Sequence, residues 1–273
     1  RGVILKAFPC FSTLILVGSF SAQAQENSLP LPERAGGTLS VPAVVMDLPD
    51  APTPRLRDGT PDLSGLWMGG GPTRDIALGL MSGEKIVLLP EAEVLMRSRL
   101  SKDDPEASCL PTGVPRIAPY PWRIVQAPQE GKATHLFFLF EGNIHSYRQI
   151  FLDGRTHPDD LDPTWYGHSI GHWEDDTLVI DTIGFNEYFW FDFRGHPHTE
   201  QLRTIERYTR TDLETLENET TIIDPGAYAE PFTIKFTATL RPGWELMEYI
   251  CNENNQDVEH LMGPAGNFPG GVQ

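Results

Sequence analysis

Cysteine is scarce in this chain, which holds only Cys10, Cys109 and Cys251. Cys10 lies in a segment at the start of the chain that we expect to be removed. An even pair of cysteines in a protein outside the cytoplasm favours a disulfide, because that environment is oxidising. We therefore predict a bond between Cys109 and Cys251. The alternative, a catalytic thiol, requires a reducing environment and a basic neighbour, and the sequence shows neither.

Basic residues are also few: 21 Lys and Arg face 38 Asp and Glu, and the formal net charge is −17. A protein with this charge repels polyanions, so the composition argues against nucleic acid and anionic membrane surfaces as partners. Small-molecule ligands or substrates remain as partners. The oligomeric state is left open.

Long apolar runs are missing except near the start. Residues 7–20 are apolar, follow the basic Arg1 and Lys6, and precede Ala22-Gln23-Ala24. This order is typical of a secretory signal peptide with a small-x-small cleavage site. The run is too short for a permanent membrane span, so no membrane insertion is expected. We predict a signal peptide over residues 1–24 and a mature protein that is periplasmic or secreted.

Two well-known catalytic patterns are absent. No serine stands in a nucleophile-elbow pattern, which argues against that kind of serine hydrolase. The glycine-rich stretch 68–72 lacks the lysine and the helix of a phosphate-binding loop, so we assign it no nucleotide role. The sequence therefore locates a candidate site better than it names a reaction.

The chain does contain a long series of strand-like segments. After a proline-rich extended leader over residues 25–61, we predict a single domain over residues 62–273, with one short helix over 90–101. Turn residues separate about ten strands, at residues 63–67, 122–126, 134–140, 144–152, two in 166–185, 202–210, 216–223, 232–240 and 244–251. This order predicts an all-β fold, either an antiparallel up-and-down barrel of the calycin or lipocalin type or a strongly curved sheet.

The most informative stretch is residues 166–185, YGHSIGHWEDDTLVIDTIGF, which predicts a β-hairpin. Strand alternation places His168 and His172 on the same face. If Asp175-Asp176 forms the two-residue turn, Asp181 lies diagonally beside both histidines on that face. An imidazole beside a carboxylate can be held in one tautomer with its pKa near neutrality, and can then transfer protons.

This chemistry requires that the histidine face lines the interior of the barrel. The opposite arrangement is the alternative, because Trp173, Leu178 and Ile180 on the other face are more apolar and would fill the core. The sequence leaves both arrangements open.

A second histidine pair, His196 and His198, stands in the segment GHPHTE. In an extended segment the two side chains face the same side about 6–7 Å apart, a spacing at which both can bind one metal ion. His168 or His172, together with a carboxylate from Asp192, Glu200 or Asp181, would complete a zinc, manganese or iron site. The alternative is that both histidines brace a loop through hydrogen bonds. No cofactor is required by the pattern, and a divalent metal stays an open alternative.

Six of the nine residues in 185–193, just before this pair, are aromatic. A loop this apolar packs on the end of the barrel as a plug or covers a ligand at its mouth. For the second case the substrate-binding candidates are Phe185, Asn186, Trp190, Asp192, Arg155 and Arg207. The two arginines suit a substrate carboxylate, and pairing with a nearby acid is their alternative.

Two resemblances accompany these patterns. Gly65-Leu66-Trp67 followed by a meander resembles the G-x-W motif of lipocalins and calycins, whose barrels hold apolar small molecules. Those families stack an arginine of the last strand on the tryptophan, and the last strand expected here has none. The runs PDLSGLW, CLPTGVPR, DGRTHP, GHSIGHWEDDTLVIDTIGF, GHPHTEQL and IERYTR resemble an uncharacterised family of secreted bacterial proteins. That resemblance implies secretion and a coherent fold, and no particular reaction.

These features favour an extracytoplasmic enzyme that acts on a small, partly apolar molecule by histidine–carboxylate acid–base chemistry, as a lyase, isomerase or hydrolase. A non-catalytic small-molecule-binding barrel and a histidine-ligated metal-dependent enzyme are the alternatives. In the first case we predict that His168, His172 and Asp181 share a pocket with His196 or His198, because the aromatic loop folds back over the hairpin.

Overall fold

The computed structural model describes residues 50–116, 120–129, 132–142, 146–253 and 263–265. The signal peptide expected over 1–24 and the part of the leader over 25–49 lie outside the described residues. The described end of the leader runs along the barrel, where the Leu213 amide donates to the Ala51 carbonyl at 3.0 Å. No helix in the described ranges is long and apolar enough to cross a membrane.

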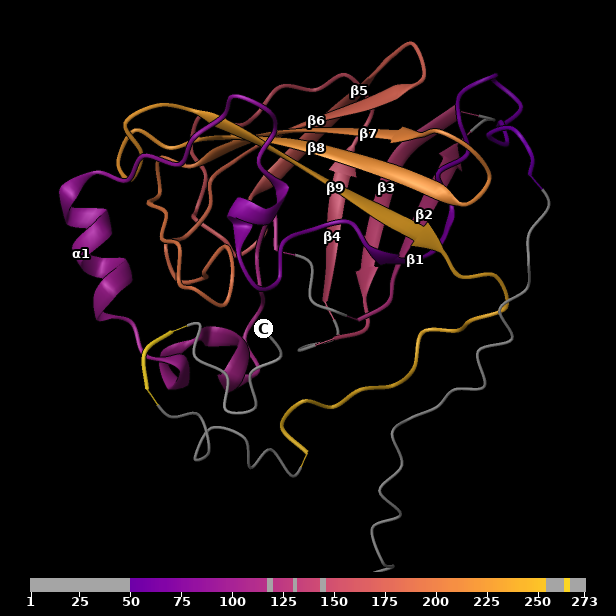
Figure 1. The fold of residues 1–273 in the computed structure, drawn as a ribbon. Coiled ribbons are helices and arrows are strands. Elements are labelled where there is room, and N and C mark those ends of the chain that lie inside the picture. Colours follow the sequence, from indigo (N-terminus) through magenta and orange to yellow (C-terminus); the bar gives the residue numbers. More distant parts are fainter. Residues whose placement is uncertain (1–49, 117–119, 130–131, 143–145, 254–262, 266–273) are drawn as a thin grey trace, which may run out of the picture. The chain divides into compact units, whose positions relative to one another are not determined.

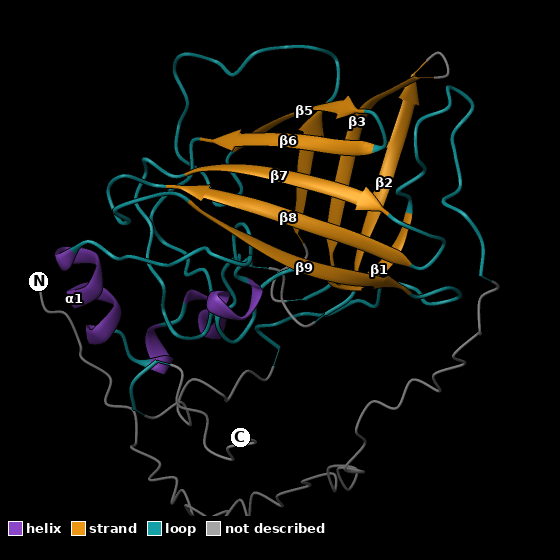
Figure 2. Cartoon of the chain, turned by 45° about the horizontal axis from the view of Figure 1, so that its top comes forward, coloured by secondary structure: helices purple, strands orange, loops and turns teal. Residues whose placement is uncertain are grey.

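The strands close a barrel in which each strand pairs with the next and the last pairs with the first (Figures 1 and 2). They are β1 (Gly65–Gly69), β2 (Trp122–Gln129), β3 (Lys132–Phe140), β4 (Ser146–Phe151), β5 (His168–Glu174), β6 (Thr177–Ile183), β7 (Arg203–Arg210), β8 (Thr215–Ile223) and β9 (Phe232–Leu240). Buried residues alternate with half-buried ones along β8, as expected for a strand with one face inside a barrel. The predicted all-β barrel is confirmed.

Two details of the strand order differ from the prediction. β4 and β5 are parallel, with Ile150 opposite Ser169, because the intervening loop returns the chain to the end of the barrel where β4 began. The expected strand over 244–251 does not form, since β1 already occupies the free edge of β9 through the pairing of Trp67 with Leu240.

The helix α1 (Pro90–Ser98) begins at the expected proline and ends three residues earlier than predicted. It ends at Arg99, which becomes extended and donates from Nη1 to the Gly195 carbonyl at 2.8 Å. Short 3₁₀ helices η1 (Ile76–Gly79), η2 (Ser101–Asp103) and η3 (Pro105–Ser108) flank it in the chain. Figure 1 shows that α1 lies outside the barrel wall.

Two hydrophobic cores stabilise the structure. The first fills the barrel, and Trp67, Trp122 and Tyr208 are its largest fully buried side chains. The second joins the loops to the starts and ends of β7, β8 and β9 through Phe185, Phe191 and other buried residues. The barrel is therefore packed with side chains, and its loops carry an apolar core of their own.

Trp67 shows how the first strand is held. Its indole Nε1 donates to the Leu63 carbonyl at 3.1 Å, and the Arg210 guanidinium lies 5.0 Å from the centre of its ring. An arginine thus does stack on this tryptophan, but it comes from the end of β7 and not from the last strand.

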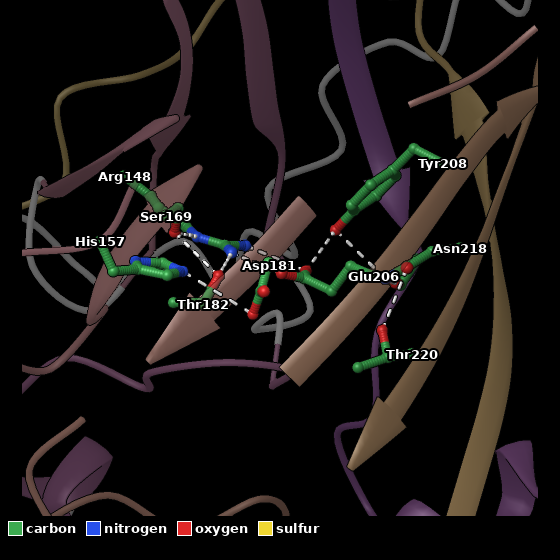
Figure 3. Close-up of polar contacts among 10 residues, drawn as sticks. Arg148, His157, Ser169, Asp181, Thr182, Glu206, Tyr208, Asn218 and Thr220 are labelled. Carbon is green, nitrogen blue, oxygen red and sulfur yellow. Dashed lines mark hydrogen bonds and ion pairs between the residues drawn. The ribbon is translucent and has the colours of Figure 1, made fainter. Parts of the chain in front are cut away.

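A buried ion pair crosses the barrel interior (Figure 3). Arg148 of β4 binds both carboxylate oxygens of Glu206 on β7, with Nη1 at 2.9 Å from Oε1. Its remaining donors reach Ser169 Oγ at 3.0 Å and Thr182 Oγ1 at 2.7 Å. The Tyr208 hydroxyl donates to Glu206 Oε1 at 3.1 Å. The polar groups of five side chains from four strands thus form hydrogen bonds with one another inside the barrel.

This network compensates for the loss of water around two charges. Burial lowers the pKa of Arg148, but the charge and hydrogen bonds of Glu206 outweigh burial and leave that pKa above its ordinary value. Burial, followed by the negative charge of Glu206, raises the pKa of Tyr208 well above its ordinary value. Arg148 is therefore charged and Tyr208 neutral at ordinary pH.

The predicted disulfide between Cys109 and Cys251 is confirmed, with a Cα–Cα distance of 5.6 Å. It ties the loop after η3 to the segment that follows β9. The Met247 amide in that segment also donates to Glu141 Oε2 at 2.7 Å. The segment is therefore fixed at two points although it forms no strand.

Replacing Arg148 with methionine should lower the free energy of unfolding by about 3–5 kcal/mol, because Glu206 would stay buried without its partner. The double variant Arg148→Met/Glu206→Leu should recover most of this loss, since no unpaired charge remains. Urea unfolding of the three proteins measures both effects. A single variant that is as stable as the double variant would contradict the role given to the ion pair.

Candidate functional site

The hairpin forms as predicted but presents its histidines to the outside. Ile170 pairs with Asp181 and His172 with Val179, as the two-residue turn requires. Asp175 in that turn has φ +52°, a conformation that aspartate tolerates better than most residues. The predicted register is therefore confirmed, and the remaining question is which face turns inward.

The face of the hairpin that turns into the barrel is the apolar one, which was the alternative to the histidine face. Leu178 and Ile180 are fully buried in the barrel core, and Trp173 packs against that core. His168, His172 and Asp181 consequently lie on the outer wall. The inward positions of β5 and β6 also carry Ser169 and Thr182, the hydroxyls that bind Arg148, so the opposite face could not turn inward without breaking that network.

His168 and Asp181 are nevertheless joined, through a residue that the sequence analysis did not single out. His157, from the loop between β4 and β5, places its Nδ1 at 2.8 Å from Nδ1 of His168. Its Nε2 lies 3.8 Å from Asp181 Oδ1, close enough for an ion pair when His157 is protonated but too far for a hydrogen bond (Figure 3). Arg203 holds Asp181 with two hydrogen bonds of 2.9 and 2.5 Å.

Both imidazoles are neutral at neutral pH. Burial lowers the pKa of His157, and Arg203 lowers it further against the opposing effect of Asp181. Burial, then the neighbouring His157 and Arg155, lower the pKa of His168. When the His157 proton sits on Nε2, facing Asp181, its Nδ1 accepts from His168 Nδ1–H, and His168 Nε2 then carries a lone pair.

The motif DGRTHP contained the signal that could have identified His157. That motif lies in the loop between β4 and β5, and strand alternation says nothing about where a loop side chain points. Only the path of the loop across the barrel wall brings His157 to His168.

The other outer-face candidates pair with acids. His172 is 65 % exposed and lies 3.2 Å from Glu174. Arg207 binds the same glutamate at 2.8 Å. Arg155 forms bidentate contacts with Asp153 and stacks over the ring of Phe151 at 3.7 Å. Both arginines are thus paired with a nearby acid, which was the alternative to binding a substrate carboxylate.

The second histidine pair lies in the core formed by the loops. His196 Nδ1 is 2.6 Å from Asp192 Oδ2, which also accepts from the Ile76 amide at 2.6 Å. His198 is packed on Phe189, with ring centres 3.9 Å apart, and its Nδ1 lies 3.3 Å from the Thr199 carbonyl. Both histidines brace the loop, which was the structural alternative.

The two histidine groups occupy different environments. His168, His172 and Asp181 are on the outer wall of β5 and β6, whereas His196 and His198 are buried under the loops. Among the described residues, no hydrogen bond or ring contact joins the two groups. The shared pocket that we expected is not formed, because the hairpin turns its histidines away from the core into which the aromatic loop packs.

Asp75, Asp192 and His196 form the one cluster in the described ranges with spacing suited to a metal ion, their ligand atoms lying within 4.8 Å of one another. His198 and Glu200, expected as further ligands, are not part of it, and Glu200 is exposed. The Asp75 carboxylate already accepts from Arg194 at 3.0 Å. The cluster can offer ligands to a divalent ion, although protein donors now occupy its carboxylates.

The aromatic loop acts as a plug. Phe185, Asn186, Trp190 and Asp192, the expected substrate-binding residues, are all buried. The Arg99 guanidinium covers Trp190 at 4.7 Å from the ring centre. Their packing matches the structural alternative and leaves no surface for a substrate.

The cavity beside the buried ion pair is small. The cavity between Gly113, Phe138, Arg148, Glu206 and Tyr208 has a volume of about 10 Å³, enough for about one water molecule. This cavity is therefore too small for an organic ligand.

Comparison of the chain with protein-family models, curated proteins and solved structures found no match. The geometry of the site is therefore what indicates a function.

The burial of His198 predicts acid sensitivity. Burial lowers its pKa to about 4, against about 6.5 in the unfolded chain. Because folding favours neutral His198, its contribution to stability is complete above pH 6.5 and is lost as the pH falls towards 4. We expect His198 to account for a loss of about 2 kcal/mol between pH 7.5 and pH 5.

His198→Leu should remove this part of the pH dependence. Urea unfolding at both pH values, for the wild type and the variant, measures the difference. An equal loss of stability in the two proteins would contradict the depressed pKa.

Proposed function

We propose that the protein is an extracytoplasmic enzyme that acts on a small, partly apolar molecule by acid–base chemistry at His168. The observation that carries this proposal is the 2.8 Å contact between the Nδ1 atoms of His157 and His168, with Asp181 next to His157. A lyase, isomerase or hydrolase reaction needs this kind of proton transfer. The location is supported by the Cys109–Cys251 disulfide and by the signal-like start of the sequence.

The proton path follows from the geometry. Nε2 of neutral His168 takes a proton from the substrate, while its own Nδ1 proton can move to Nδ1 of His157. The positive charge then faces Asp181, which Arg203 holds in place. Depressed pKa values keep both imidazoles neutral and able to accept a proton at neutral pH. His168 is the catalytic residue, and His157, Asp181 and Arg203 position it.

A non-catalytic binding protein is the first alternative, favoured by the absence of a recognised catalytic motif in the sequence. A metal-dependent enzyme is the second, and the cluster of Asp75, Asp192 and His196 favours it. A bound metal would supply Lewis acidity there, and His196 would hold it with the two carboxylates.

His168→Gln should reduce turnover by about 10²–10⁴-fold, the usual loss when a general acid–base group is removed. The matched control is His172→Gln, because His172 lies on the same strand face outside the His157–His168–Asp181 relay; its turnover should change less than about twofold, as is usual for surface substitutions. Because the substrate is unidentified, purified protein is incubated with a small-molecule extract, and mass spectrometry follows conversion. Wild-type turnover should fall as the pH drops below the depressed pKa of His168.

Equal conversion by wild type and His168→Gln would rule out His168 as the catalytic base. His157→Gln separates positioning from folding, since it should retain part of the turnover but alter its pH profile. A wild-type protein that converts nothing and retains a small molecule would favour the binding alternative.

The metal alternative has its own test. If the cluster binds a divalent ion, purified protein should contain about one equivalent. Added zinc, manganese or iron should then stabilise it by about 2.7 kcal/mol at 100 times the dissociation constant. His196→Ala should abolish both effects, and Glu200→Gln should leave them unchanged because Glu200 is exposed. Elemental analysis and melting curves without any such effect would remove this alternative.

A further inference from the structure

Six aromatic and imidazole rings form a continuous row on the outer wall of the barrel, which we call the outer ring row. In order along the row they are Tyr147, Phe137, His135, Phe151, His168 and His157. Successive ring centres lie 6.3, 6.3, 5.3, 5.2 and 5.0 Å apart. The rings come from β3, β4, β5 and the loop after β4. The row therefore crosses the wall and ends at the proposed catalytic residue His168 and its neighbour His157.

The row is accessible. Tyr147 is 63 % exposed, and the other five rings are half-buried. A contiguous exposed patch of aromatic groups on a soluble domain commonly marks a binding surface. Tyr147 and Phe151 are four residues apart on one strand, about 13 Å, which is the length of a ligand with two or three rings.

A groove of about 410 Å³ lies at the Tyr147 end of the row. Leu139 and Tyr147 form one side, and the segment Leu246, Met247 and Glu248 forms the other. Its volume is within the range of small-molecule sites. The hydrogen bond from Met247 to Glu141 and the disulfide at Cys251 hold the second side in place.

The opposite end of the row holds two arginines, each paired with an aspartate. The Arg155 guanidinium stacks on Phe151 beside His168, and Arg203 lies near His157. Both arginines use Nε and Nη2 for their aspartate partners. Among the described residues neither Nη1 donates a hydrogen bond, so each arginine has a donor left for an anion.

We propose that the outer ring row binds a small molecule with a flat apolar body and an anionic group, with the body on the rings and the anion beside Arg155 and Arg203. This inference rests on the proposed function, because it names the substrate class of the same site. Glu141 and Glu248 line the groove and would repel an anion there, so the charge directs the anionic group towards His168.

The net charge of −17 argues for a small molecule over larger occupants. A second copy of the chain would bring a second large negative net charge, and a polyanion would meet the same repulsion. A small molecule with a single anionic group is repelled far less than a polyanion or a second copy of the chain. Two guanidinium donors and neutral imidazoles can hold that group.

Two fluorescent probes with the same ring body test this inference. 1-Anilinonaphthalene-8-sulfonate carries an anionic group, and N-phenyl-1-naphthylamine lacks it. At neutral pH the wild type should bind the sulfonate more tightly than the neutral amine. Tyr147→Ala should weaken both probes by about tenfold, the loss expected for one aromatic contact of about 1.4 kcal/mol. Arg155→Gln should weaken only the sulfonate.

Tyr188→Ala is the matched control, because Tyr188 is 65 % exposed and its described ring contact is with Trp165, outside the row. Its probe affinities should equal those of the wild type. The inference is overturned if Tyr147→Ala behaves like Tyr188→Ala, or if Arg155→Gln weakens both probes equally. It is also overturned if Tyr147→Ala converts a dimer to a monomer in sedimentation, since the row would then be an interface between copies.

His168→Gln separates this inference from the proposed function. Retained probe binding with lost turnover supports both. Unchanged turnover in His168→Gln, with probe binding lost in Tyr147→Ala, would leave the binding inference standing and the acid–base proposal refuted. Circular dichroism and melting curves confirm that each variant is folded before probes are added.

Discussion

The ion pair between Arg148 and Glu206 decides the orientation of the wall that carries the candidate site. A guanidinium buried in a barrel needs hydrogen-bond acceptors for its donors, and Ser169 and Thr182 supply them from β5 and β6. Strand geometry points neighbouring side chains to opposite faces. Once Ser169 and Thr182 face inward, His168 and Asp181 must face outward. The buried network around Arg148 and the position of the histidines on the outer wall therefore have the same cause, which is the need to provide acceptors for the buried guanidinium.

The filled interior has a further consequence for function. A calycin-like fold suggests a ligand inside the barrel, but here Trp67, Trp122, Phe138 and the ion pair occupy that space. The outer wall offers accessible rings, a groove and imidazoles that solvent can reach. The parallel pairing of β4 and β5 is essential to this arrangement, because the crossover loop that it requires carries Arg155 and His157 across the wall.

The loop that contains His196 and His198 illustrates how burial decides what a histidine can do. His198 is enclosed by phenylalanine rings, and burial lowers its pKa to about 4, so it stays neutral over the physiological range. His196 is fixed by Asp192, whose carboxylate also holds the start of η1 through the Ile76 amide. These contacts close the loop over the second core. The same residue type on the outer wall remains accessible and able to exchange protons.

The sequence by itself determined the strands that form the barrel, their alternation, the register of the hairpin and the pairing of Cys109 with Cys251, since these depend on local patterns and on simple counting. It also predicted a strand over 244–251 that does not form, because β1 already pairs with β9. It also identified His168 and Asp181 as neighbours on one face. Alternation defines two faces but does not say which is inside, and that choice was made by Arg148, about twenty residues away in the chain. Likewise, His157 comes from a loop without periodicity, and only the tertiary path of that loop brings it to His168. The strand pattern could be predicted because neighbouring residues set it, whereas the site depends on contacts between distant segments.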